Sequence, residues 1–324
     1  MQQKLLEILA KIQNKKILVI GDIMLDKYIW GKVKRISPEA PVQIVNVDRE
    51  SYVPGGAANV ASNITSISAN AFMVSIVGND TAKNILIEEL KKRNVNTDGI
   101  FIDDSKPTVQ KVRVIGHNQQ LLRIDYEKDH RINTDVEQKV IAYIEKMMPK
   151  IDAIIISDYS KGLVTENVAK HAIEEANKQR KIAVIDPKPK HKKYYANSTI
   201  ITPNNTEASE LTGISGEEDE EISEMGKTIM AEINSNVLIT RGERGMTLFE
   251  KNGNITNIPT KAKEVYDVTG AGDTVVAVLT AALCTGANYF ESASLANYAA
   301  GIVVGKVGTS SVTIDEIKKS IEND

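Results

Sequence analysis

The sequence has a single cysteine, a single tryptophan and only four phenylalanines among its 324 residues. One cysteine can form no disulfide within the chain, which indicates a reducing compartment, so we expect a cytoplasmic protein. Cys284 lies in the apolar segment LTAALCTG. We therefore interpret it as a small buried side chain rather than a reactive thiol.

An excess of positive charge is also absent. The formal net charge is -3, which argues against a basic surface for nucleic acid. No apolar run reaches the length of a membrane span. The amphipathic start of the chain, residues 1–16, lacks the apolar core of a signal peptide. Because no Gly/Ser linker, low-complexity tract or repeat divides the sequence, we expect one globular domain over 1–324.

Short runs rich in Ile and Val alternate along the chain with helical patterns. The runs do not alternate apolar with polar residues, which is typical of strands that are buried on both faces. Strand, helix and strand in this rhythm predict an α/β fold with a mostly parallel sheet. The expected strands are 16–22, 71–78, 153–159, 182–188, 199–204 and 236–242, and the expected helices include 80–93, 134–149, 164–178 and 218–234.

Two segments follow a different pattern. Residues 27–53 and 98–127 alternate apolar and polar side chains, which is typical of half-exposed antiparallel strands. We interpret them as a small β-lid attached to one edge of the α/β core.

Polar residues follow the core strands at their carboxyl ends. Parallel sheets bind ligands beyond these ends, so five such clusters predict one site. Asp22 or Asp158 alone would be explained equally well as a helix cap. The clusters are Asp22; Asp158 with Lys161; Asp186 with Lys188; Asn204 with Glu207; and Arg241 with Glu243.

Two glycine pairs each precede a predicted helix. In DVTGAGDT, Gly270 and Gly272 allow a tight turn before a helix over 272–286, with Asp273 in its first turn. The amides of 270–273 would then bind an anion, phosphate above all. In PGGAANVA, Gly55 and Gly56 open another helix. Neither loop is a Walker A motif, and no dinucleotide fingerprint follows the first strand.

The motifs GGAANVA and DVTGAGDT, in this order, resemble those of the ribokinase-like (pfkB) family of sugar kinases. The resemblance covers nearly the whole chain and implies a three-layer α/β sandwich with a β-lid. GDIMLDKYIWGKVKRISPEAPVQIV, LLRIDYE, SDYSKG, TRGERGMTLF and GIVVGKVGT are similar to the branch that phosphorylates D-glycero-β-D-manno-heptose 7-phosphate at its anomeric hydroxyl. This implies ATP and Mg²⁺ as cofactors. Since no H-x-G-H nucleotidyl motif is present, we expect a kinase without a fused adenylyltransferase.

The resemblance also implies roles for individual residues. Asp273 would be the general base, and Gly270, Ala271 and Gly272 would form the anion hole with it. Asn204 and Glu207 would position Mg²⁺ through water, and Thr240, Gly242, Asn297 and Gly301 would flank the nucleotide. The sugar would contact Asp22, Gly55, Gly56 and Asn59, and the residues proposed for its remaining groups and its phosphate are Arg113, Arg123, Asp158, Lys161, Asp186, Lys188 and Lys190.

The sequence leaves alternatives open for the acceptor and for the class of protein. The acceptor could be ribose, fructose, a fructose phosphate or a nucleoside. Two positions depart from the usual pattern of the heptose branch: His117, where relatives tend to carry arginine, and DPKPK in place of D-P-K-G. A non-catalytic sensor is disfavoured by the intact motifs, and a dinucleotide-dependent dehydrogenase by the missing fingerprint. Pairing of two lids predicts a homodimer.

Overall fold

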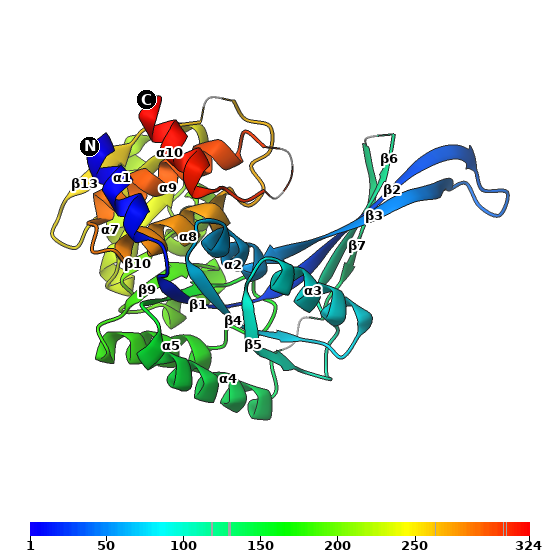
Figure 1. Cartoon of the computed structure of the whole chain (residues 1–324), viewed down its shortest axis with the longest axis horizontal. Coiled ribbons are helices and arrows are strands. Elements are labelled where there is room, and N and C mark those ends of the chain that lie inside the picture. Colours follow the sequence, from blue (N-terminus) through cyan, green and yellow to red (C-terminus); the bar gives the residue numbers. More distant parts are fainter. Residues whose placement is uncertain (118, 129–130, 263, 307, 309) are drawn as a thin grey trace.

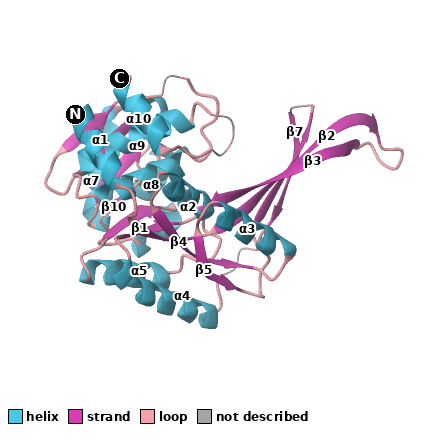
Figure 2. Ribbon diagram, viewed as in Figure 1, coloured by secondary structure: helices cyan, strands magenta, loops and turns pink. Residues whose placement is uncertain are grey.

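The computed structural model describes residues 1–324 except 118, 129–130, 263, 307 and 309. It contains strands in two sheets, with helices packed around the larger one (Figure 2). The large sheet has nine strands in the order β13-β12-β11-β10-β9-β8-β1-β4-β5, and the small sheet has four in the order β3-β2-β6-β7. The strands are β1 Lys16–Gly21, β2 Ile23–Ile36, β3 Gln43–Gly56, β4 Asn70–Val77, β5 Asn96–Ile102, β6 Gln110–Gly116, β7 Gln119–Tyr126, β8 Ala153–Ser157, β9 Ile182–Asp186, β10 Ile200–Ile201, β11 Asn236–Thr240, β12 Met246–Phe249 and β13 Ile255–Ile258.

Helices cover both faces of the large sheet, and successive residues of one strand enter different cores. Ile17 and Val19 of β1 pack with α1, α2, α3, α8, α9 and α10. Leu18 and Ile20 pack with α4, α5, α6 and α7 on the other face (Figure 1). This two-sided burial explains why the strands lack polar alternation. The helices are α1 Gln2–Lys11, α2 Ala57–Ser66, α3 Thr81–Lys92, α4 Thr134–Met147, α5 Glu166–Lys178, α6 Asn205–Thr212, α7 Asp219–Ile233, α8 Ala271–Leu283, α9 Tyr289–Val303 and α10 Ile314–Glu322.

The predicted three-layer α/β fold is confirmed, and its topology fixes where a ligand can bind. Strands β5, β4, β1, β8, β9, β10 and β11 run parallel, with antiparallel β12 and β13 at one edge. The chain builds outward from β1 toward β5 and then from β8 toward β11, so strand order reverses between β1 and β8. Ligands of such sheets bind beyond the carboxyl ends of the strands at this reversal.

The small sheet forms an arm that projects from the body of the molecule (Figure 1). It consists of two antiparallel hairpins, β2–β3 and β6–β7, joined through the parallel pair β2–β6. We call this sheet the lid. It starts at Gln110 in its second segment, whereas residues 98–102 of the expected lid belong to β5 in the large sheet. No helix in the described part of the chain is both long and apolar enough to span a membrane.

Candidate active site

The polar ends of four parallel strands and the start of α8 surround one cavity of about 190 Å³, which we call the central cavity. Residues that follow β8, β9 and β10 line it together with the last residue of β11. Of the strand-end clusters expected from the sequence, Asp186 with Lys188 and Asn204 with Glu207 line this cavity. The expected residues after β1, β8 and β11 do not line it, namely Asp22, Asp158, Lys161, Arg241 and Glu243. The lining residues are Tyr159, Asp186, Lys188, Thr202, Asn204, Glu207, Thr240, Gly270, Gly272 and Asp273.

Asp273 is buried in the first turn of α8, with only 6% of its surface exposed. Its two carboxylate oxygens accept hydrogen bonds from different elements: Oδ2 from Asn59 Nδ2 at 2.7 Å and Oδ1 from the Tyr159 hydroxyl at 2.7 Å. Burial raises the pKa of Asp273 from 3.8 to about 6, although both hydrogen bonds oppose the rise. A carboxylate with this pKa is ionised at neutral pH and is a stronger base than an exposed aspartate.

The helix behind Asp273 starts without a side-chain cap. Gly270 is its N-cap residue and has φ = 81°, a left-handed conformation suited to glycine. A Cβ atom at Gly272 would meet no heavy atom within 4 Å, because the residue faces open space. The first amides of a helix have no partner within it, and its positive end attracts anions. The turn can therefore bind the phosphate of a ligand beside the Asp273 carboxylate.

A larger cavity of about 470 Å³ adjoins the central cavity, and Thr240 and Gly272 line both. Its walls are mostly apolar and include Met246, Val265, Val268 and Val304. We call it the apolar cavity. An apolar cavity that opens onto a helix N-terminus fits the nucleobase of a nucleotide at one end and its phosphates at the other. All four residues predicted to flank a nucleotide line it: Thr240, Gly242, Asn297 and Gly301.

Acidic side chains gather opposite α8 in the central cavity. Lys188 Nζ pairs with Glu207 Oε1 at 2.6 Å. Glu207 also forms a capping box with Asn204, in which each side chain accepts the backbone N–H of the other. Burial, followed by the charges of Asp273 and Glu207, raises the pKa of Asp186 well above its ordinary value. Such mutual repulsion between carboxyl groups would be relieved by a cation in the cavity.

This donor set fits Mg²⁺ held largely through water. Among the described residues, no group of three or more His, Cys, Asp or Glu side chains has the geometry of a metal site. Mg²⁺ commonly uses only one or two carboxylates, with water and substrate phosphate as its other ligands. Asp186 and Glu207 supply such oxygens, while the Asn204 side chain is already used to cap α6.

Two predicted ligand residues instead hold the loop that follows β8. The carboxylate of Asp22 is 2% exposed and accepts the backbone N–H groups of Tyr159, Lys161 and Leu163 at 3.2, 2.9 and 3.0 Å. Asp158 accepts the N–H of Ser160 at 2.7 Å and the hydroxyl of Tyr195 at 2.6 Å. Both carboxylates are therefore occupied by the protein itself and fix the loop 158–163.

The glycine pair at the end of β3 has a packing reason of its own. A Cβ atom at Gly55 would lie 2.3 Å from Asp26 Oδ2, and one at Gly56 would lie 2.5 Å from the Asp22 carbonyl oxygen. Gly56 also has φ = 61° and caps α2, the helix that presents Asn59 to Asp273. These glycines therefore let the end of β3 pack closely against Asp26 and the Asp22 backbone.

Sequence reasoning missed Asp26 and Tyr159. Asp26 is 7% exposed in β2, and its carboxylate pairs with Arg113, whose guanidinium lies 5.3 Å from the ring centroid of Tyr28. The charge of Asp26 also raises the pKa of Asp273. In the sequence, the only indication of Asp26 was its spacing of two residues from Tyr28, which puts both side chains on the same face of the strand. Arg123, by contrast, is half exposed and pairs with Asp125 in β7.

A basic hollow of about 220 Å³ lies on the other side of Tyr159, which lines both it and the central cavity. Lys128, Lys161 and Lys190 line this hollow, together with Glu127. Glu127 neutralises part of the charge, because its Oε2 lies 2.8 Å from Lys161 Nζ. The hollow still has a net positive charge and can accept an anionic group.

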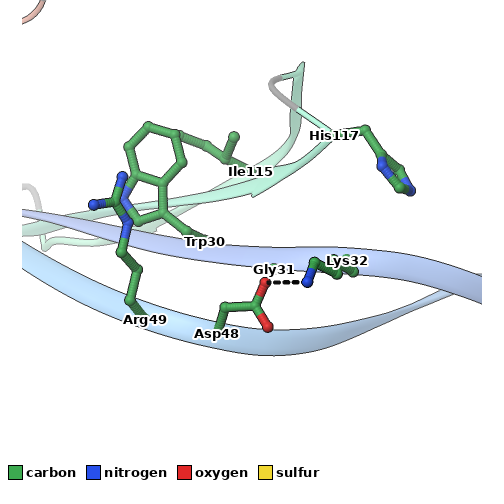
Figure 3. A pocket seen from close by; sticks show the side chains of 7 residues that line it. All are labelled: Trp30, Gly31, Lys32, Asp48, Arg49, Ile115 and His117. Carbon is green, nitrogen blue, oxygen red and sulfur yellow. Dashed lines mark ion pairs between the residues drawn. The ribbon is translucent and has the colours of Figure 1, made fainter.

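A separate hollow of about 390 Å³ lies on the lid (Figure 3). Arg49 stacks over Trp30 with its guanidinium carbon 4.8 Å from the ring centroid, and Lys32 lies 3.8 Å from Asp48. His117 also lines it. This hollow shares no lining residue with the central or apolar cavity, so we do not include it in the candidate active site.

Comparison with known proteins agrees with this geometry. Residues 14–316 match the family model described as pfkB family carbohydrate kinase. The chain is 43% identical over 305 residues to the bifunctional protein HldE of Geobacter sulfurreducens, and 43% identical over 310 residues to that of Helicobacter hepaticus. These matches cover 94% and 95% of this chain, but only 62% and 64% of the two relatives.

Solved structures support the fold. A ribokinase from Arabidopsis thaliana complexed with ribose and ATP has a TM-score of 0.71 at 19% identity, covering 96% of this chain and 98% of its own. Phosphofructokinase-2 from Escherichia coli in complex with potassium has a TM-score of 0.78 at 18% identity, covering 96% and 99%. The predicted family and fold are therefore confirmed.

The raised pKa of Asp273 predicts a stability cost. Because the folded-state pKa of about 6 exceeds the ordinary 3.8, the cost is absent below pH 3.8 and complete above pH 6. A shift of about two units corresponds to ~3 kcal/mol, of which Asp273→Asn should recover about 1–2 kcal/mol at pH 8, since asparagine cannot accept both hydrogen bonds. Urea unfolding at pH 8 and pH 4 measures this gain. An equal difference between variant and wild type at both pH values would contradict the prediction.

Proposed function

The chain belongs to the pfkB family of carbohydrate kinases, and from this premise we propose that it transfers the γ-phosphoryl group of ATP to the anomeric hydroxyl of D-glycero-β-D-manno-heptose 7-phosphate. The product would be the 1,7-bisphosphate, an intermediate of nucleotide-heptose biosynthesis. The observation that carries the proposal is the position of Asp273. It lies at the positive end of α8 in the central cavity, which shares Thr240 and Gly272 with an apolar cavity suited to a nucleotide and Tyr159 with a basic hollow suited to a sugar phosphate.

In the proposed reaction, Asp273 accepts the proton of the acceptor hydroxyl as that oxygen forms its bond to the γ-phosphorus. The bond from phosphorus to the bridging oxygen breaks, and ADP leaves. The amides of Gly272 and Asp273 at the start of α8 stabilise the negative charge on the transferred group, whereas the Ala271 N–H donates to the Val268 carbonyl at 3.2 Å. The chain's contribution is largely positioning and electrostatic stabilisation, as is usual for phosphoryl transfer.

The nucleotide would lie with its base in the apolar cavity and its phosphates at the shared boundary with the central cavity. Gly272 lines both cavities and leaves the open space that the phosphates need. Mg²⁺ bound with ATP would neutralise phosphate charge. Asp186 and Glu207 are the carboxylates that would hold it, through water, and Lys188 beside them adds a positive charge.

The acceptor would extend from Asp273 past Tyr159 into the basic hollow. A seven-carbon sugar carries its 7-phosphate at the opposite end from its anomeric hydroxyl. Binding of this acceptor therefore requires a proton-accepting group and a cationic site that are separated by the length of the sugar. This proposal is supported by Tyr159, which lines both the central cavity with Asp273 and the basic hollow with Lys161 and Lys190. We assign the sugar hydroxyls to Asp26 and Arg113, which pair with each other in the lid.

A coupled assay of ADP release tests the acceptor. With ATP and Mg²⁺, we expect turnover with D-glycero-β-D-manno-heptose 7-phosphate and none with the unphosphorylated heptose, ribose or fructose 6-phosphate. Asp273→Asn should lower the rate by roughly 10²–10⁴-fold, because it removes the base but leaves the cavity intact. Turnover with a different acceptor would preserve the mechanism and refute the heptose. Binding of ATP without turnover of any acceptor would favour a sensor.

The basic hollow predicts where phosphate specificity comes from. Lys190→Met should raise KM for the heptose phosphate about tenfold with little change in KM for ATP, since one charge-assisted hydrogen bond is worth roughly 1.5–3 kcal/mol. Lys193→Met is the matched control, because Lys193 is exposed in the same segment and does not line the hollow. Equal effects of the two substitutions on KM would exclude the hollow as the phosphate site.

We further propose that two chains pair through the apolar face of the lid. The strand register puts Val47, Leu122 and Ile124 on the same face as Ile29 and Val114. Val47 and Leu122 are each 55% exposed. The same face also carries the ion pair of Lys27 with Glu50, at 2.9 Å, so we assign the pairing to the exposed apolar residues, which favour burial against a partner. The opposite face holds Asp26 and Arg113 and remains available to the sugar.

Light scattering coupled to size-exclusion chromatography tests this pairing. We expect the wild type to have twice the chain mass of 35.5 kDa. Leu122→Asp with Ile124→Asp should yield a monomer, because four charges would be brought together in the paired lids. Gln119→Asp adds a charge at the end of the same strand and should leave the dimer intact. A monomeric wild type would contradict the proposal.

A further inference from the structure

Tyr159 contacts the proposed base from a distant part of the chain. It lies two residues beyond β8, and its hydroxyl donates a 2.7 Å hydrogen bond to Oδ1 of Asp273, 114 residues away. Asn59 of α2 donates to the other oxygen at 2.7 Å. The carboxylate is thus held from two sides. We infer that Tyr159 is a positioning residue, which fixes the orientation of the Asp273 carboxylate and favours its ionised, proton-accepting form.

The loop that carries Tyr159 is itself held in place. Asp22 accepts the N–H of Tyr159 and two further backbone N–H groups of the same loop. Ser160, the next residue, has φ = 57°, an uncommon conformation for a residue other than glycine. Its N–H is bound by Asp158 at 2.7 Å. Two buried carboxylates therefore maintain a backbone turn whose result is the position of one hydroxyl group.

The tyrosine hydroxyl acts as a donor and not as an acid. Burial, together with the charge of Asp273, raises the pKa of Tyr159 well above its ordinary value, so the hydroxyl keeps its proton. A hydrogen bond that a carboxylate accepts stabilises the ionised form and lowers the carboxyl pKa. During transfer the acceptor's proton passes to Asp273 alone, and Tyr159 neither gains nor loses one.

Other charged groups face Asp273 from the elements packed around it. Asp26 of β2 raises its pKa, while Lys188, which follows β9, lowers it. Asp186 interacts with Asp273 and Glu207 as one acidic cluster. Lys188 also lies 5.7 Å from the centre of the Tyr159 ring. Replacing tyrosine by phenylalanine keeps the ring in place and removes only the donor, so these other influences are retained.

The first test needs no acceptor and is therefore independent of the proposed function, on which the inference about proton transfer rests. Free energies of unfolding are measured from pH 4 to pH 9 for the wild type, Asp273→Asn, Tyr159→Phe and the double variant. Wild type is compared with Asp273→Asn, and Tyr159→Phe with the double variant. In each comparison the difference in free energy of unfolding grows with pH until Asp273 is fully ionised in the folded protein, and the pH at which it stops growing gives the pKa of Asp273. We expect Tyr159→Phe to move that pKa upward by about one unit, the usual worth of one hydrogen bond.

The pH dependence of kcat/KM gives the second readout. In the wild type, kcat/KM, which reports the pKa of the free enzyme, should decline below about pH 6 as Asp273 becomes protonated. In Tyr159→Phe the decline should begin about one pH unit higher, which at pH 6 is a loss of about fivefold that is mostly recovered at pH 8.5. Tyr143→Phe is the matched control: this residue lies on α4 against Phe101 and should leave the profile unchanged.

The outcomes separate cleanly. An unshifted Asp273 pKa in the unfolding measurements would overturn the inference, whatever happens to activity. A kcat/KM lowered by the same factor at every pH, or an unfolded Tyr159→Phe protein, would assign Tyr159 a purely structural role and overturn it too. A shifted pKa with no acceptor turned over would leave the inference standing and refute the proposed function.

Discussion

The central sheet must be covered on both faces, because each strand points apolar side chains in both directions. Ile17 and Val19 enter one core while Leu18 and Ile20 enter the other, and helices from both halves of the chain fill the two layers. Polar side chains are thereby confined to the edges of the sheet. The carboxyl edge is where α8 starts and where loops from β8, β9 and β10 meet, so this one constraint of burial also determines where the chemistry can take place.

The same reasoning explains how much the sequence could predict. Two-sided burial leaves uninterrupted Ile and Val runs, so the positions of the buried strands were predictable, and the turn at Gly270 marked the start of α8. The contact between Tyr159 and Asp273 joins positions 114 residues apart, and no local pattern encodes it. Asp22 has the residue type expected for a ligand, but its oxygens point at the backbone of the loop after β8. Residue type and strand position predict where a cluster lies, whereas the direction of each carboxylate depends on tertiary packing.

The site also concentrates negative charge where burial makes it costly. Asp273 and Asp186 both have raised pKa values, since burial and neighbouring carboxylates oppose their ionisation. Lys188, Asn59 and Tyr159 compensate for part of this cost with a charge and two donors. A fully compensated carboxylate would be a weak base, and an uncompensated one would stay protonated at neutral pH. The intermediate pKa of about 6 for Asp273 is the range in which a base is both ionised and reactive.

The lid extends this division between polar and apolar surface beyond the core. Along β2, Asp26, Tyr28 and Trp30 lie on one face, where Arg113 and Arg49 stack over the two rings. Ile29 lies on the other face, beside Val114 and the exposed Leu122. Stacked arginines keep a charged surface ordered without burying it. A sheet with one such face can cover a polar ligand, and exposed apolar residues on its other face favour burial. The alternation that distinguished 27–53 in the sequence therefore provides two surfaces on one sheet, which we assign to the proposed substrate and to the proposed second chain.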